Sequence, residues 1–299
     1  MKTSYAELHC HTNYSFQEGA SSVEELLVRA KELGHQALAI TDHGNLCGVM
    51  HFAQVARSVG VQAITGAEVS LNDGSHLTLL AETQQGYANL SRLISYAYIS
   101  GERRNPSLDP EHLSGLTEGL ILLTGCRRGR LSSLLAQGDQ GEAREQLGQY
   151  LDWFGPSNVF VELQQNLVYG DTQRNRRLIQ LAHDAGVEVA ATNNVHYHAP
   201  ERHRLQDALV SIQHNLSLDE SHRERRANGQ FYLKPAREMA ALFDGCPEAL
   251  ENTLRIAERC DFDLTRDLGY RFPDYPVPQG FTPVTYLRHL CHQAARRRY

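Results

Sequence analysis

Side chains that can bind a metal ion follow five of the apolar segments that we predict to be β-strands. Parallel strands of an α/β barrel gather their carboxyl ends around one mouth, so side chains at those ends converge in space. Imidazole and carboxylate ligands with at most one thiolate suit Zn, Mn or Fe better than Mg or Ca. The residues at these strand ends are His9, His11, Asp42, His43, Glu68, Cys126, Asn194 and His196.

The first pair, His9 and His11, has a spacing of two residues. Alternate side chains of a strand share one face, so both imidazoles are expected on the side opposite Leu8 and Cys10. Two nitrogen donors on one face can chelate one cation. The pair alone is weak evidence, and its coincidence with ligand-type residues at four further strand ends favours a metal site.

The set is too large for one ion, and two or three adjacent cations are expected. Such clusters bind and polarise a phosphate and activate water, which favours phosphoester hydrolysis. Amide or amidine hydrolysis in an amidohydrolase barrel is the alternative, since that barrel also begins with His-x-His. Many such barrels need a carboxylated lysine at a strand end, whereas the three lysines, Lys2, Lys31 and Lys234, lie elsewhere. This disfavours the alternative but leaves its single-metal forms open.

The elements that must position these residues alternate between strand-length apolar runs and amphipathic helices. Repeated strand–helix units imply parallel strands with right-handed crossovers. Seven such units indicate an α/β fold. They favour a distorted (β/α)7 barrel over an open sheet. The predicted strands lie near residues 5–10, 36–41, 61–65, 76–81, 119–124, 158–164 and 187–192.

The helix between the first two strands has clear start and stop signals. Ser22 and Glu25 form a capping-box pattern, and Gly34 ends the helix. The predicted buried stripe comprises Val23, Leu26, Leu27, Ala30 and Leu33. Gly60 and Gly186 give the same stop signal after helices predicted at 46–59 and 171–185.

The sequence changes character after about residue 200. Helices are predicted at 201–213, 235–243 and 247–260, and a proline-rich linker at 267–283 leads to a helix at 284–298. We therefore expect a barrel core at about 1–200, a helical extension at 201–266 and a separate segment at 267–299.

Composition excludes several protein classes. The chain has 299 residues, 41% of them hydrophobic, and a net charge of −6, so it is not a globally basic nucleic-acid binder. Six cysteines without a CxxC pair argue against a disulfide framework and a zinc ribbon. Apolar runs stay well below the ~20 residues of a bilayer span. A cytoplasmic protein with no membrane partner is expected.

Several motifs resemble the PHP (polymerase and histidinol phosphatase) superfamily. They include the stretches Glu7–Phe16, Glu18–Ala20, Ala37–Leu46, His76–Ala81, Gly119–Cys126 and Ala191–Tyr197. The stretches Leu205–Leu209, Phe231–Lys234 and Pro247–Thr253 are also similar to the bacterial C-family DNA polymerases, the DnaE-type alpha subunits. The opening Glu-Leu-His-Cys-His is most similar to the error-prone branch.

The resemblance implies a site for up to three metal ions with nine ligands. Glu18 and Asn194 stand where this family has aspartate, and the second change removes a negative charge. The ligands implied are His9, His11, Glu18, His43, Glu68, His76, Cys126, Asn194 and His196. His43 and Glu68 are expected to act in catalysis together with Asp42, which orients a ligating histidine.

The resemblance also implies an activity and partners. Members with an intact site are associated with 3′–5′ exonuclease activity on DNA, and the polymerase palm would lie beyond residue 299. Expected partners are a single-stranded 3′ end, the remainder of the polymerase chain, and other replisome or translesion proteins. Arg127 and Arg128 follow Cys126 directly and are predicted phosphate contacts. A non-catalytic structural platform and a free-standing phosphatase for a small phosphoester remain as alternatives.

Overall fold

The structure is a computed structural model that describes residues 4–101, 106–270 and 274–299. The chain divides into two compact units, Met1–Asp267 and Leu268–Tyr299. Residues 271–273 of the predicted linker lie outside the described ranges. None of the helices within those ranges combines the length and the apolar character that crossing a membrane requires.

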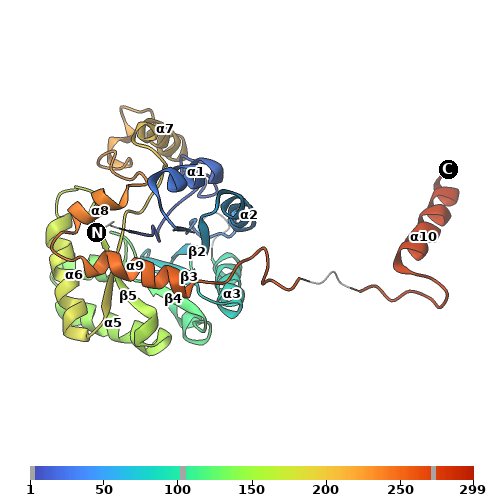
Figure 1. The fold of residues 1–299 in the computed structure, drawn as a ribbon, viewed down its shortest axis with the longest axis horizontal. Coiled ribbons are helices and arrows are strands. Elements are labelled where there is room, and N and C mark those ends of the chain that lie inside the picture. The colour runs from blue at the N-terminus through green and yellow to red at the C-terminus, as the bar shows by residue number, and fades with distance from the viewer. Residues whose placement is uncertain (1–3, 102–105, 271–273) are drawn as a thin grey trace. The chain divides into compact units, whose positions relative to one another are not determined.

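The first unit is built on a six-stranded sheet with the strands in sequence order (Figure 1). Its strands match the predicted apolar runs, because a strand that is buried on both faces needs apolar residues along its whole length. They are β1 (Ala37–Ile40), β2 (Gln62–Ser70), β3 (His76–Ala81), β4 (Leu120–Leu123), β5 (Val159–Gln164) and β6 (Glu188–Thr192).

The N-terminal segment connects the two edges of this sheet. Glu7 forms a parallel bridge with Leu38 beside β1, and Cys10 forms one with Val195 beyond β6. The His11 amide donates to the Val195 carbonyl at 2.8 Å. The segment predicted as a strand at 5–10 is thus held by isolated bridges, and it completes the seven-part α/β barrel that the sequence predicts.

The prediction that all strands are parallel is wrong at β3, which runs antiparallel to both β2 and β4. Only residues 71–75 connect β2 to β3, and a parallel crossover needs a dozen residues or more. The reversal places His76 at the start of β3 opposite Ser70 at the end of β2. A strand start therefore lies at the mouth. The same hairpin extends β2 beyond the predicted residue 65, so Glu68 lies within a strand instead of after one.

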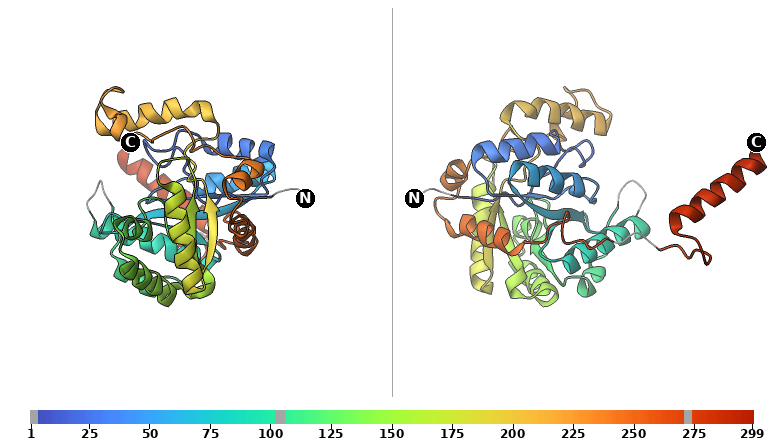
Figure 2. Two further views of the ribbon diagram at one scale, coloured as in Figure 1. Left: turned by 90° about the vertical axis from the view of Figure 1, so that its left-hand side faces the viewer. Right: turned by 45° about the vertical axis from the view of Figure 1, so that its right-hand side comes forward.

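Helices cover the outside of the sheet. In α1 (Val23–Leu33) the capping box of Ser22 and Glu25 and the left-handed Gly34 are as predicted, and Leu33 is only half-buried. Helices α4 (Arg130–Gln137), α5 (Gln140–Phe154) and α6 (Asp171–Ala185) pack on one another, and α5 and α6 also pack on the strands (Figure 2). The covering helices are α1, α2 (Val49–Val59), α3 (Gln84–Ser100), α4, α5 and α6.

Helix α9 (Glu248–Arg259) seals the barrel at the end opposite the mouth. Ile256 and Ala257 join the apolar cluster that contains Leu8 and Ile64. Thr253 Oγ1 accepts a hydrogen bond from the backbone of Ala6 at 3.2 Å. Helix α9 of the predicted helical extension therefore packs into the barrel core, and the extension also contains α7 (His203–His214) and α8 (Ala236–Leu242). The second unit contains α10 (Pro283–Arg298).

Candidate metal centre

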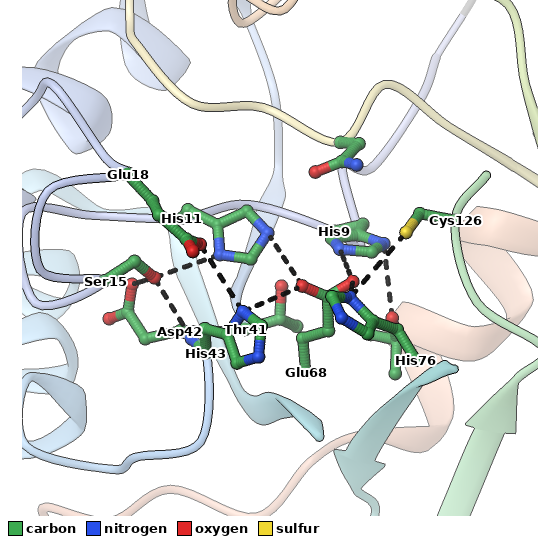
Figure 3. Close-up of polar contacts among 12 residues, drawn as sticks. His9, His11, Ser15, Glu18, Thr41, Asp42, His43, Glu68, His76 and Cys126 are labelled. Carbon is green, nitrogen blue, oxygen red and sulfur yellow. Dashed lines mark hydrogen bonds and ion pairs between the residues drawn. The ribbon is translucent and has the colours of Figure 1, made fainter. Parts of the chain in front are cut away.

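The carboxylate of Glu68 lies at the centre of the predicted ligands and faces four histidines (Figure 3). Its Oε1 atom is 3.5 Å from His9 Nε2 and 3.1 Å from His76 Nδ1. Its Oε2 atom is 3.7 Å from His11 Nε2 and 3.6 Å from His43 Nδ1. A carboxylate in this position can bridge two cations.

The ligand atoms form three overlapping groups, each with its atoms within 4.8 Å of one another. Glu68 belongs to two of the groups and His11 to two. Seven of the nine residues implied by the resemblance are included. The groups are His9, His11 and Glu68; His11, Glu18 and His196; and His43, Glu68 and His76.

Four buried side-chain atoms in these groups lack hydrogen-bond partners among the described residues. They are His9 Nε2, His11 Nε2, His76 Nε2 and Glu68 Oε1. Unpaired buried polar atoms are costly and rare in folded proteins. Here several of them converge on one place, and imidazole and carboxylate donors suit divalent transition metals. The residues therefore fit a site for divalent metal ions.

The orientation of His9 is fixed by Glu162 on β5. Glu162 Oε1 lies 2.7 Å from His9 Nδ1, so the Nδ1–H group donates to it and Nε2 is left free for a cation. Such carboxylate–histidine pairs fix the ligand tautomer at metal sites. Sequence analysis did not select Glu162. The available signal was a glutamate in the otherwise apolar run Val159–Leu163.

Asp42 reaches the site through Ser15. The Ser15 hydroxyl donates to Asp42 Oδ1 at 2.7 Å and accepts from His11 Nδ1 at 3.0 Å. Asp42 also accepts from the backbone and hydroxyl of Thr12. This geometry gives Asp42 a positioning role toward His11, and its predicted catalytic role stays a prediction.

His43 lies at the more open side of the site. Its Nε2 contacts Ser70 Oγ at 2.8 Å, while its Nδ1 lies 3.4 Å from Glu18 Oε2. Glu18 is the residue that stands in place of an aspartate, and its carboxylate still reaches the ligand groups. Burial would raise the pKa of Glu18, but His43 lowers it to about 2, so the carboxylate is charged.

Cys126 and Asn194 lie outside the three groups, which contain only the residues named above. Cys126 Sγ is 3.9 Å from His76 Nδ1, and burial raises the pKa of the thiol well above its usual value. Asn194 adopts a left-handed conformation with φ 48°, and its backbone carbonyl accepts from His196 Nδ1 at 2.9 Å. The buried Asn194 Oδ1 has no hydrogen-bond partner among the described residues.

One further residue that the sequence does not single out, Arg226, reaches the site. Its guanidinium contacts His196 Nε2 and lies 4.6 Å from the ring centroid of Phe231. No ion pair to a carboxylate involves Arg226 within the described ranges. No local sequence pattern could reveal this contact, because the segment that carries Arg226 folds back over the barrel mouth.

The two arginines predicted to contact phosphate diverge. The backbone amide of Arg128 donates to Cys126 Sγ at 3.4 Å and its carbonyl accepts from the His76 amide at 3.2 Å, so Arg128 lies beside two of the predicted ligands. Arg127 instead donates to the Tyr169 carbonyl at 3.0 Å and lies 3.6 Å from Asp171. Their role in phosphate binding stays a prediction.

The electrostatics of the cluster favour cation binding. Burial would lower the pKa of His9, but the carboxylates of Glu162 and Glu68 raise it to about 10. Burial would also raise the pKa of Glu68, but His76 and His9 hold it well below its usual value. In the metal-free protein a proton on His9 offsets the buried carboxylates, and a cation at Nε2 would displace this proton.

Many barrels of the amidohydrolase alternative need a carboxylated lysine among the ligands. Lys234 is buried, but its Nζ donates to the Gln230 carbonyl and to Asn193 Oδ1. Lys31 lies in the last turn of α1, and Lys2 lies outside the described residues. Among the described residues, the ligand groups thus contain no lysine.

Comparisons with known proteins agree with these features. The PHP domain family model matches residues 7–166. The chain is similar to an error-prone DNA polymerase of Symbiobacterium thermophilum, with 40% identity covering 99% of this chain and 29% of that protein. It is also similar to a DNA polymerase III subunit alpha of Treponema pallidum, with 38% identity covering 100% of this chain and 27% of that protein. The chain therefore spans less than a third of these relatives.

One solved structure with a similar arrangement is an amidohydrolase from Chromobacterium violaceum. The TM-score is 0.43 and the sequence identity 15%, and the match covers 64% of this chain and 88% of that one.

Proposed function

The chain belongs to the PHP domain family, and we propose that it is a metal-dependent phosphoesterase that removes nucleotides from the 3′ end of single-stranded DNA. The observation that carries the proposal is the set of buried, unpaired ligand atoms around Glu68. Two or three divalent ions would be held there. Zn and Mn are the proposed metals, and Fe is the third option. When bound, such ions bind and polarise a phosphate and activate water.

The protein side chains have separate roles in this proposal. The three ligand groups hold the ions, and Glu68 bridges two of the groups. Glu162 holds His9 with its Nε2 atom toward the site, and Ser15 does the same for His11. Arg128 and Arg226 supply positive charge for a phosphate at the mouth.

We further propose that residues 1–266 act as the PHP domain of a longer DnaE-type polymerase of the error-prone branch. The curated similarities support this assignment, since the relatives are polymerases of which the chain covers less than a third. The proposed partners are a DNA 3′ end, the remaining polymerase chain and other replisome or translesion proteins. The proposed location is the cytoplasm.

The test is degradation of a 5′-labelled single-stranded oligonucleotide with added Mn or Zn and with a chelator. The variant Glu68→Gln keeps the side-chain shape and should lose at least about 100-fold in rate, because loss of a residue that only supports a metal ligand already costs about 10- to 100-fold. The control Glu24→Gln alters a surface pair with His51 and should leave the rate unchanged. A circular single strand should resist cleavage, and its cleavage would show an endonuclease instead.

A second candidate function is a structural platform without hydrolysis. Asn194 favours it, because an amide in place of a carboxylate weakens one cation site. In that case metal would raise the melting temperature without any shortening of DNA. Turnover of histidinol phosphate with no action on DNA would instead favour a small-molecule phosphatase.

A further inference from the structure

A cavity of about 500 Å³ lies between α4 and α6, outside the metal centre. Three arginines line it: Arg127 before α4, and Arg174 and Arg177 on α6. The exposed amides of Gln137 and Gln173 and the hydroxyl of Ser133 complete much of the wall. The lining is therefore rich in hydrogen-bond donors.

The cavity carries an excess of positive charge. None of the described residues that line it is acidic. The buried carboxylate of Asp171 is shared by two of these arginines, since it lies 2.8 Å from Arg174 Nη1 and 3.6 Å from Arg127 Nη2. No ion pair of Arg177 occurs between described residues. Three guanidinium groups thus face one carboxylate, although the whole chain has a net charge of −6.

These guanidinium groups are held in place, unlike those of a solvated helix face. Arg174 donates to the Gln164 carbonyl at 2.9 Å, and Arg177 donates to the Leu135 carbonyl. Arg127 donates to the Tyr169 carbonyl. Each retains further N–H groups that can point to a ligand, because a guanidinium has five donors. Preorganised donors of this kind suit an oxyanion.

The position of the cavity connects it to the metal centre. Arg127 follows Cys126 directly, so their Cα atoms are ~3.8 Å apart. The N-cap of α6, Gly170, lines the cavity and has no side-chain cap. The positive end of the α6 dipole therefore adds to the arginine charge. Further along α6, Arg176 and Arg177 line a second hollow, where Arg144 pairs with Asp184 at 3.5 Å.

We propose that this cavity binds the sugar–phosphate backbone of the single-stranded DNA whose 3′ end lies at the metal centre. The proposal rests on the proposed function for the identity of the strand. It assigns the cavity a second phosphate, next to the one that is cleaved, and gives the site a preference for a polynucleotide over a mononucleotide or free phosphate.

The test measures binding of a fluorescent oligothymidylate to the metal-free chain in a chelator, over a series of salt concentrations. Each lost phosphate contact should lower affinity about fivefold at 0.1 M salt. It should also reduce the salt slope, the steepness with which the logarithm of the binding constant falls with the logarithm of salt concentration, by ~0.7. Arg177→Gln should show this loss. Arg255→Gln removes an exposed arginine of α9 that pairs with Glu188 at the start of β6, and this variant should bind like the unchanged chain.

A second variant guards against a folding defect. Gln173→Glu is nearly isosteric, lies at an exposed position and adds a negative charge to the cavity wall. It should weaken oligothymidylate binding, whereas Gln54→Glu on α2 should not. Inorganic phosphate or thymidylate that competes as well as the oligomer at equal phosphate would show an anion pocket and no strand site.

The strand site and the nuclease activity are tested independently of each other. Unchanged affinity and salt slope in both Arg177→Gln and Gln173→Glu would overturn the strand site, whatever the nuclease assay shows. Binding that depends on these residues, together with no hydrolysis in any metal, would retain the strand site and reject the nuclease. With metal, Arg177→Gln should lower kcat/KM for the oligomer but not for a small phosphodiester.

Discussion

Replacement of Glu162 by glutamine tests whether His9 is a metal ligand. Glu162 Oε1 receives hydrogen bonds from His9 Nδ1 at 2.7 Å, Gln164 Nε2 at 2.7 Å and Thr192 Oγ1 at 2.5 Å. Its Oε2 is buried without a partner among the described residues. A glutamine can keep its oxygen at the Oε1 position and place its NH₂ group at the Oε2 position. Glu162→Gln therefore removes the charge and keeps the hydrogen bonds.

The expected cost follows from this geometry. Loss of the residue that orients a ligating histidine lowers metal affinity 10- to 100-fold, which corresponds to about 1.4–2.7 kcal/mol. The cause is that the carboxylate makes His9 a more basic ligand and fixes its proton on Nδ1. The loss should appear for one ion of the set, because His9 belongs to only one of the three ligand groups.

The assay is competition for Zn or Mn with a chromophoric chelator, at fixed pH and with the stoichiometry measured. The matched control, Glu188→Gln, changes an exposed glutamate at the start of β6 and should leave affinity within twofold of the unchanged chain. Unchanged affinity and stoichiometry in Glu162→Gln would refute the reasoning that Glu162 supports a metal-binding His9. A melting-temperature measurement would separate this outcome from unfolding.

Three further predictions concern other parts of the barrel. Asn194→Asp should raise metal affinity at least about tenfold in chelator competition. The reason is that a unit charge ~4 Å from a cation is worth several kcal/mol at an effective dielectric of ~20. Equal affinity in the two proteins would place Asn194 outside the coordination sphere. Arg226→Gln should lower kcat/KM for DNA at least about tenfold, because a charged hydrogen bond to the phosphate is lost. Metal affinity should be unchanged or higher, because the guanidinium no longer contacts His196. An unchanged kcat/KM would show that Arg226 does not contact the phosphate. Burial lowers the pKa of Lys234 from 10.5 to about 8, so between these values the unfolded chain binds more protons and folding stability rises with pH. Denaturant unfolding should show the parent chain gaining up to about 3 kcal/mol over Lys234→Met between pH 8 and 10.5, and parallel pH curves for the two proteins would contradict this.

The sequence predicts the elements of the barrel well because their signals are local. The capping box of Ser22 and Glu25 and the left-handed glycines that end α1, α2 and α6 depend on neighbouring residues only. Short apolar runs locate the strands for the same reason, since burial on both faces demands continuous apolar character. The ligand types at the strand ends follow from these positions. His9, His11 and His196 were predicted in this way and meet at the mouth.

The tertiary structure alone decides the direction of β3, because pairing is a contact between segments. In an all-parallel barrel only the carboxyl ends of the strands lie at the mouth. His76 is the first residue of its strand, so the expected parallel arrangement could not place it there. The short connection after β2 reverses β3, and His76 thereby reaches Glu68.

The partners of the ligands also depend on distant contacts. Glu162 lies 153 residues after His9, and Arg226 lies 30 residues after His196. Neither spacing has a local pattern, because the closure of the barrel and the return of the chain over its mouth create these contacts. The sequence by itself therefore determines which side chains are available to bind metal. The tertiary structure determines which atoms face one another, which lack a partner, and which charges balance them.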